Sequence, residues 1–163
     1  MPDRGFVTTA DKARVELAEL SQHLPSLAEL ARNAARLPLF VAEYQRWYTR
    51  ARRLVELLGH DRLDEFESYY LADPRRRTID DSTYCIQDYI LAVRPSLPSK
   101  SDVHRAVVLR LTAQVSILQS LESRLEGVCA EIGGEMLAEL ERSELEAARK
   151  ILKVSPRAAG VLT

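Results

Sequence analysis

The sequence predicts an all-α protein, and two observations support that fold class. Apolar residues recur at helical spacing from residue 10 almost to the end of the chain. No segment alternates apolar and polar residues for long, so half-buried strands are not indicated. We therefore expect an elongated helical bundle in which one long, heptad-patterned helix packs antiparallel on a second helix.

The length and composition predict a single helical domain spanning residues 1–163. The chain has 23 Lys and Arg against 24 Asp and Glu, so no overall field attracts nucleic acid or an anionic membrane. Cys85 and Cys129 each lie among apolar residues of predicted helices. We therefore expect buried free thiols, which are typical of proteins in a reducing compartment. Because we find neither a signal peptide nor the ~18 consecutive apolar residues of a membrane span, we expect a cytoplasmic protein with no membrane partner.

The N-terminal part, residues 10–37, is predicted to form a helical hairpin. Its first helix runs from Ala10 to His23, and its second runs from Leu27 to Leu37. Pro25 opens the second helix at a position where a missing N–H costs least.

The middle part, residues 38–100, is predicted to contain aromatic-rich helices and a connector. A helix that starts at Pro38 ends at Gly59, a residue type common at helix C-caps. A short helix over 61–71 follows, and then Asp80 or Asp81 caps another helix. The helix from Pro38 carries an apolar stripe at steps of three and four, and we expect its tryptophan to be mostly buried: Phe40, Tyr44, Trp47, Ala51, Leu54 and Leu58.

The last part, residues 101–163, is predicted to hold the long helix and a C-terminal helix. Ser101 or Asp102 caps the long helix. If Ser143 forms a capping box with Glu146, a separate last helix begins there; otherwise the long helix continues through Gly133-Gly134. Only Gln114 interrupts the apolar seam of the long helix, which consists of Val107, Leu111, Leu118, Leu121, Leu125, Val128 and Ile132.

The sequence contains no recognisable catalytic constellation, so we expect a protein that is not an enzyme and needs no cofactor. His23, His60 and His104 are far apart, and no histidine or cysteine pair has the spacing of a metal site. Gly133-Gly134 lacks the further glycine and the lysine of a phosphate-binding loop.

Arginines near aromatic residues are the candidates for nucleic-acid binding. Arginines hold phosphates while aromatic rings stack on unpaired bases, a combination suited to single-stranded RNA. The acidic residues interleaved with these arginines favour the alternative interpretation, a solvated helix face and a charged loop. The candidate residues are Arg50, Arg53, Tyr70, Arg75, Arg76 and Arg77.

Four short segments occur in a characteristic order: YQRWY at 44–48, DRLDEF at 61–66, ILQSLESRL at 117–125 and SELEAARKIL at 143–152. Together, over about residues 40–160, they resemble the helical N-terminal half of a bacterial family whose C-terminal half is a HEPN-like domain. HEPN-like domains are helical bundles found in RNA-cleaving toxins and phage-defence proteins. The resemblance therefore implies a phage-defence or toxin–antitoxin context.

The sequence departs from this family where the family's chemistry lies. In such proteins the Ala-Ala-Gly segment, matched here by residues 158–160, opens a bundle helix, and an arginine–histidine pair lies well downstream. This sequence ends at Thr163, so we expect it to be the accessory half without the HEPN catalytic half. Arg53 and His60 have a compatible spacing but not the family's position, and we expect Gly59 to end the helix between them.

We therefore predict a non-catalytic helical module for protein–protein interaction or oligomerisation, with a second copy or another helical protein as partner. The alternative is an RNA-binding or RNA-cleaving HEPN-like defence component. The apolar face near the end of the chain needs a surface to cover it. The candidate protein-interaction residues are Leu145, Ala148, Ile151 and Leu152.

Overall fold

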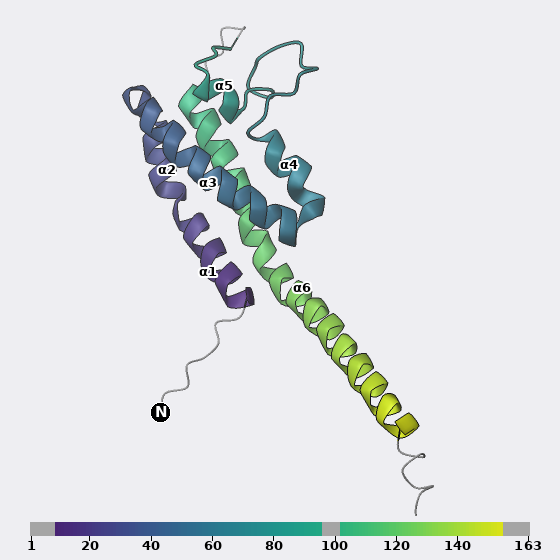
Figure 1. The fold of residues 1–163 in the computed structure, drawn as a ribbon. Helices are drawn as coiled ribbons and strands as arrows, with labels where there is room; N and C mark the ends of the chain where they lie inside the picture. The colour runs from purple at the N-terminus through teal and green to yellow at the C-terminus, as the bar shows by residue number, and fades with distance from the viewer. Residues whose placement is uncertain (1–8, 96–101, 155–163) are drawn as a thin grey trace, which may run out of the picture. The chain divides into compact units, whose positions relative to one another are not determined.

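A computed structural model describes residues 9–95 and 102–154, apart from the side chains at 9, 126, 128, 129, 132–137, 140, 148 and 151–154. Every regular element in the described residues is a helix, which confirms the all-α prediction (Figure 1). The α-helices are α1 (Thr9–Gln22), α2 (Leu24–Ala31), α3 (Leu37–Leu58), α4 (Leu63–Ser68), α5 (Ile86–Ile90) and α6 (Val103–Val154), and the short 3₁₀ helices are η1 (Ala34–Arg36) and η2 (His60–Arg62).

The chain separates into two compact units, Met1–Leu125 and Glu126–Thr163. The first unit contains α1 to α5 and the beginning of α6, and the second contains the rest of α6. The single domain over residues 1–163 stays a prediction.

Helices α1 and α2 form a bent pair, not the hairpin predicted for residues 10–37. Only His23 separates them, and its backbone is itself in the right-handed helical region. The chain therefore bends without reversing, and Figure 1 shows α1 and α2 following one another along the same side of α3. Reversal comes later, at 32–36, where the Asn33 side chain accepts a hydrogen bond from the N–H of Ala35 and starts η1.

Helix α3 confirms its predicted boundaries and its apolar stripe. Pro38 stands in its first turn, and the Gly59 N–H closes its last turn by donating to the Val55 carbonyl at 2.8 Å. Five of the six predicted stripe residues are buried, and Leu58 at the end is half-buried. Trp47 is only 3% exposed, which confirms its predicted burial.

Within the first unit, α3 and α6 run in the same direction, so the predicted antiparallel packing was wrong. Ala31, shortly before α3, has its carbonyl oxygen 2.5 Å from Nδ1 of His104 at the start of α6. Asp61, just after the end of α3, pairs with Arg124, which lies at the end of the part of α6 that belongs to the first unit. The direction is explained by α4 and the segment after it, which already carry the chain back to the start of α3 (Figure 1).

The antiparallel neighbours of α3 are instead α1 and α2 on one side and α4 on the other. On one side, the Trp47 indole N–H donates to the Leu20 carbonyl at 2.9 Å. On the other side, Arg52 contacts Glu67 of α4 at 2.6 Å. Helix α3 is thus central to the first unit, and its rings join an aromatic cluster with centroids 4.5–6.3 Å apart that includes Phe40, Tyr44, Trp47, Tyr48, Phe66, Tyr70 and Tyr89.

The buried face of α6 between 103 and 125 is wider than a coiled-coil seam. Its five predicted seam residues in this stretch are all buried, and Val115 and Ile117 are buried as well. A broad apolar face is typical of a helix that packs against several neighbours. Val128 and Ile132, the last two seam residues, have side chains outside the description.

Two predicted helix starts are resolved by hydrogen bonds. Asp102 caps α6, since its carboxylate accepts from the His104 N–H at 2.9 Å. Neither Asp80 nor Asp81 caps α5, which begins only at Ile86 with Cys85 as its N-cap. Asp80 organises a preceding turn instead, because its Oδ1 accepts from the Ser82 N–H at 2.9 Å.

Helix α6 continues through Gly133-Gly134 and through Ser143 up to Val154. Of the two alternatives for the end of the chain, the continuous helix is therefore the observed one, and Ser143 does not begin a new helix. Among the described residues, no helix combines the length and the apolar character needed to cross a bilayer.

Candidate binding surfaces

Arg50, a candidate for phosphate binding, is held by two carboxylates of α1. Its guanidinium lies 3.3 Å from Glu16 and 3.1 Å from Glu19. The hydrogen bond from Arg50 lowers the pKa of Glu19 below its ordinary value. Because two carboxylates already neutralise its charge, we interpret Arg50 as a residue that stabilises the contact between α1 and α3 and not as a phosphate-binding residue.

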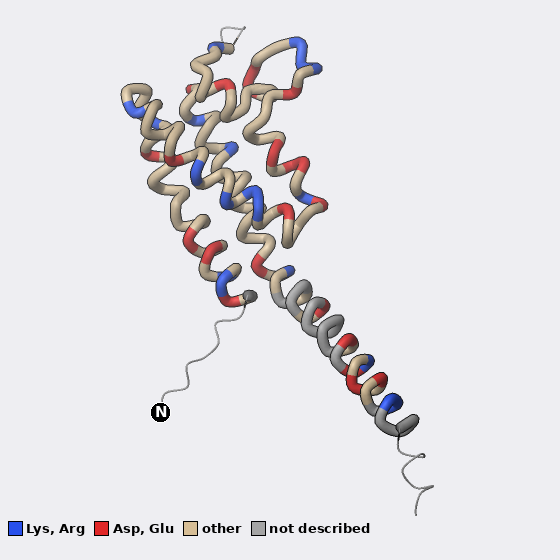
Figure 2. Tube along the Cα trace, viewed as in Figure 1, with Lys and Arg blue, Asp and Glu red and all other residues tan. Residues whose placement is uncertain are grey.

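Arg53 and Arg77 are exposed, and neither forms an ion pair with another described residue. They lie on different parts of the first unit, on α3 and on the segment after α4. Figure 2 shows why no uniformly basic surface results: the blue residues of α3 lie between red ones, and the charged residues of α4 are all red. The structure therefore leaves free arginines but does not gather them into a basic stripe.

Arg76 is the centre of a clasp that fastens the 72–85 segment onto α5. Its two terminal nitrogens lie 2.5 and 2.6 Å from the two carboxylate oxygens of Asp88. The same guanidinium donates to the Thr83 carbonyl at 3.0 Å. Paired donors and acceptors of this kind are the strongest ion-pair geometry available to arginine. The side chains of Arg76 and Asp88 are 15% and 3% exposed, so this arginine is structural.

The Asp88 carboxylate is satisfied on all sides. It also accepts hydrogen bonds from the Cys85 N–H at 2.9 Å and from the Cys85 thiol at 3.3 Å. Burial alone raises the pKa of Asp88, but the hydrogen bonds from Arg76 and Cys85 outweigh it and lower that pKa below its ordinary value. Burial also raises the pKa of the Cys85 thiol, so this cysteine stays protonated and unreactive near neutral pH.

Tyr70 is half-buried and already engaged. Its hydroxyl oxygen accepts a hydrogen bond from the Gln45 amide at 2.7 Å. Its ring packs against Tyr48 and Tyr44, with centroids 4.5 and 5.6 Å away. A base stacking on Tyr70 would have to displace these contacts.

An open groove of about 850 Å³ brings two of the candidate arginines together. Arg75 and Arg76 line it with Arg110 of α6, beside the exposed apolar side chains of Leu71 and Leu109. Three acidic residues share this lining, however: Asp64, Glu67 and Asp73. The mixed charge gives the groove no clear preference for an anion.

The described residues contain no group of three or more His, Cys, Asp or Glu that could hold a metal ion. His60 lies in η2, beyond the Gly59 that ends α3, so Arg53 and His60 do not share a helix. This separation is the one that the position of Gly59 predicted.

One buried polar contact was not anticipated from the sequence. The Tyr44 hydroxyl donates to Gln114 Oε1 at 3.1 Å, and Gln114 Nε2 donates to the Phe66 carbonyl at 3.2 Å. Gln114 thus links α3, α4 and α6 in the middle of the core. The sequence did place Gln114 on the apolar seam of the long helix, and a polar side chain that is buried there must form hydrogen bonds.

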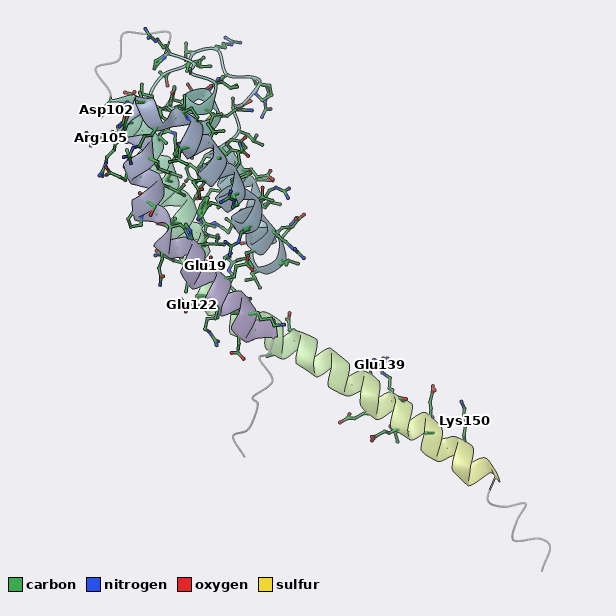
Figure 3. The ribbon with its side chains drawn as sticks, turned by 60° about the vertical axis from the view of Figure 1, so that its left-hand side comes forward. Glu19, Asp102, Arg105, Glu122, Glu139 and Lys150 are labelled. Atoms are coloured by element: carbon green, nitrogen blue, oxygen red, sulfur yellow. The ribbon has the colours of Figure 1, made fainter. Side chains whose placement is uncertain are left out.

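In the second unit, Leu145 is the described member of the candidate protein-interaction set, and it is 59% exposed. The side chains of Ala148, Ile151 and Leu152 lie outside the description. The hydrogen bonds and ion pairs of the described side chains in 126–154 stay within the helix: Arg142 contacts Glu139 at 3.0 Å and the Ala138 carbonyl at 3.3 Å. In Figure 3 the labelled side chains of Glu139 and Lys150 project away from α6.

Comparisons with protein-family models, with curated proteins and with solved structures found no match to this chain.

Proposed function

We propose that the protein is a non-catalytic helical interaction module that binds a helical partner through residues 126–154 of α6. The observation that carries this proposal is Leu145, a large apolar side chain that stands 59% exposed on this helix. The bacterial phage-defence or toxin–antitoxin context belongs to the same proposal and is supported by the HEPN-related resemblance. A place in the cytoplasm is part of the proposal too, and the buried free thiol of Cys85 supports it.

The energetics of an isolated helix support this assignment. Most helical stability in proteins comes from packing an apolar face on another element, because a helix alone is marginal in water. In the second unit, α6 is the only element among the described residues. A partner helix would supply the missing surface, by the physics of helix-in-groove recognition.

Charge narrows the kind of partner. Residues 126–154 have seven glutamates and four Lys or Arg residues, and three of these four lie at 149–153. Glu131, Glu141 and Glu144 are exposed in the structure and form no ion pair with other described residues. Such a surface favours a partner that offers Lys or Arg beside its apolar face.

Light scattering on the full chain tests the module directly. One chain has a mass of 18.4 kDa, and we expect a larger mass at high micromolar concentration. Leu145→Glu places a charge in the proposed interface and is expected to lower that mass. Leu57→Glu is the matched control, because Leu57 is an exposed helical leucine (65%) on α3 and should leave the mass unchanged.

A strict monomer whose mass is insensitive to deletion of 143–163 would remove self-association and leave only a foreign helical partner. A larger mass that Leu145→Glu does not change would place the association outside 126–154 and contradict the proposal.

RNA binding is the second candidate function, and the free arginines Arg53 and Arg77 are the observation in its favour. A salt titration of RNA binding distinguishes the two functions. Phosphate contacts weaken steeply as salt rises, whereas apolar helix packing does not. Tight RNA binding that falls with salt and is lost in Arg53→Ala and Arg77→Ala would favour this alternative.

A further inference from the structure

The face of α6 that carries Leu145 also carries opposite charges at its two ends. Glu131 and Arg149 are 18 residues apart, which is about five helical turns, so they lie on the same line of the helix about 27 Å apart. Ala138 and Leu145 fall between them and within about 40° of that line. All four residues are exposed.

From this arrangement we infer that the helical partner is a second copy of this chain, paired antiparallel along residues 126–154. The inference rests on the proposed function and names its partner. In a two-fold symmetric contact, each copy presents the same patch, and residue i of one copy meets residue j of the other while j meets i. Self-complementarity therefore requires that i and j share one face, as Glu131 and Arg149 do.

The register follows from the two charges. When Glu131 of one copy is set opposite Arg149 of the other in antiparallel pairing, facing residues have numbers that add to 280. Glu131 then faces Arg149 of the other copy, and Arg149 faces its Glu131.

Charge disfavours parallel pairing in register. Parallel pairing in register would set Glu131 beside Glu131 and Arg149 beside Arg149, and like charges at facing positions are unfavourable. Neither residue forms an ion pair with another described residue of its own chain, so both are available to a second copy. Ala138 and Leu145 supply the apolar contact, and the charges at the two ends decide the orientation.

Charge reversal on the full chain tests the pairing through the dimer dissociation constant, measured by sedimentation equilibrium. Glu131→Lys and Arg149→Glu each break two symmetry-related pairs, and each is expected to weaken the dimer about tenfold at low salt. The double variant, E131K with R149E, restores both pairs and should recover most of the affinity. Glu144→Lys is the matched control, because this exposed glutamate lies about 140° around the helix from Glu131.

Disulfide cross-linking tests the orientation independently. In a Cys129→Ser background, a chain with Glu131→Cys is mixed with a chain with Arg149→Cys and oxidised. Antiparallel pairing predicts cross-links between the two different chains, and parallel pairing predicts cross-links between identical chains.

The outcomes separate this inference from the proposed function. Dimers that cross-link identical positions, or that the double variant does not restore, overturn the antiparallel pairing while leaving the interaction module intact. A strict monomer overturns the second copy as partner. A dimer insensitive to Leu145→Glu overturns the proposed function itself.

Discussion

Arg75 and Arg76 are neighbours in the sequence but occupy opposite environments. Arg75 is 91% exposed and lies 3.5 Å from Asp73, whereas Arg76 is enclosed by Asp88 and the Thr83 carbonyl. Removing one partner of a buried ion pair leaves an uncompensated charge, which costs far more than losing an exposed pair.

Arg76→Ala is therefore expected to lower the free energy of unfolding by about 3 kcal/mol. Arg75→Ala, the neighbouring control, should change it by less than about 0.5 kcal/mol. Urea denaturation followed by circular dichroism measures both. Equal effects of the two substitutions would show that the clasp around Asp88 is not structural.

The lowered pKa of Asp88 predicts a specific dependence of stability on pH. A carboxyl whose pKa is lower in the folded chain contributes stability above its ordinary pKa and loses that contribution as the pH falls through its folded pKa. The free-energy difference between wild type and Asp88→Asn should therefore be largest near neutral pH and shrink below about pH 4. A difference that stays constant from pH 7 to pH 2 would contradict this assignment.

At the scale of the elements, Gly59 is where the end of α3 meets α6. A Cβ atom built at Gly59 would lie only 2.3 Å from Cδ2 of Leu121, a fully buried side chain with little room to move. The backbone at Gly59 has φ of −149°, which any residue adopts, so close approach and not conformation requires glycine here.

Gly59→Ala is accordingly expected to destabilise the first unit by about 1–3 kcal/mol, the cost of overpacking a core. Gly127→Ala is the control with the opposite sign. A Cβ at Gly127 meets nothing within 4 Å, and alanine stabilises a helix interior by about 1 kcal/mol relative to glycine. Thermal unfolding monitored by circular dichroism measures both, and a stabilising Gly59→Ala would show that Leu121 has room to move.

Trp47 ties α3 to α1 through its N–H, which donates to the Leu20 carbonyl, and its ring packs near Phe66 of α4. Trp47→Ala removes a buried indole and should cost about 3–5 kcal/mol, whereas Trp47→Phe keeps an aromatic ring and should cost less. Denaturant titration of the two variants measures the difference. An unchanged midpoint for Trp47→Ala would mean that the indole is dispensable to the core.

At the scale of the whole molecule, we expect no RNA cleavage. Arg53 and His60 are the arginine and histidine whose spacing in the sequence is compatible with a HEPN-type pair, but the end of α3 separates them. We therefore expect the purified protein to leave mixed RNA intact. His60→Ala is the control, and it should behave as wild type on a denaturing gel. RNA cleavage by the wild type that disappears in His60→Ala would overturn the non-enzymatic assignment.

The sequence by itself determined the fold class and several local features. Helical periodicity marked α3 and the buried face of α6, Gly59 marked the end of α3, and Asp102 was one of two predicted caps. These features are set by residues within a few turns of one another, so a local pattern is sufficient to find them. The Leu145 surface was also visible at this level, as an apolar residue in a strongly acidic helix.

Only the tertiary structure decided how these helices are arranged. The direction of α6 along α3 depends on how often the intervening chain reverses, and short irregular segments such as 69–85 control that number without a periodic signal. The same holds for Arg76 and Gln114, whose roles come from Asp88, Tyr44 and Phe66. These partners lie on other segments of the chain and come into contact only when the chain folds, so a pattern within one helix does not reveal them.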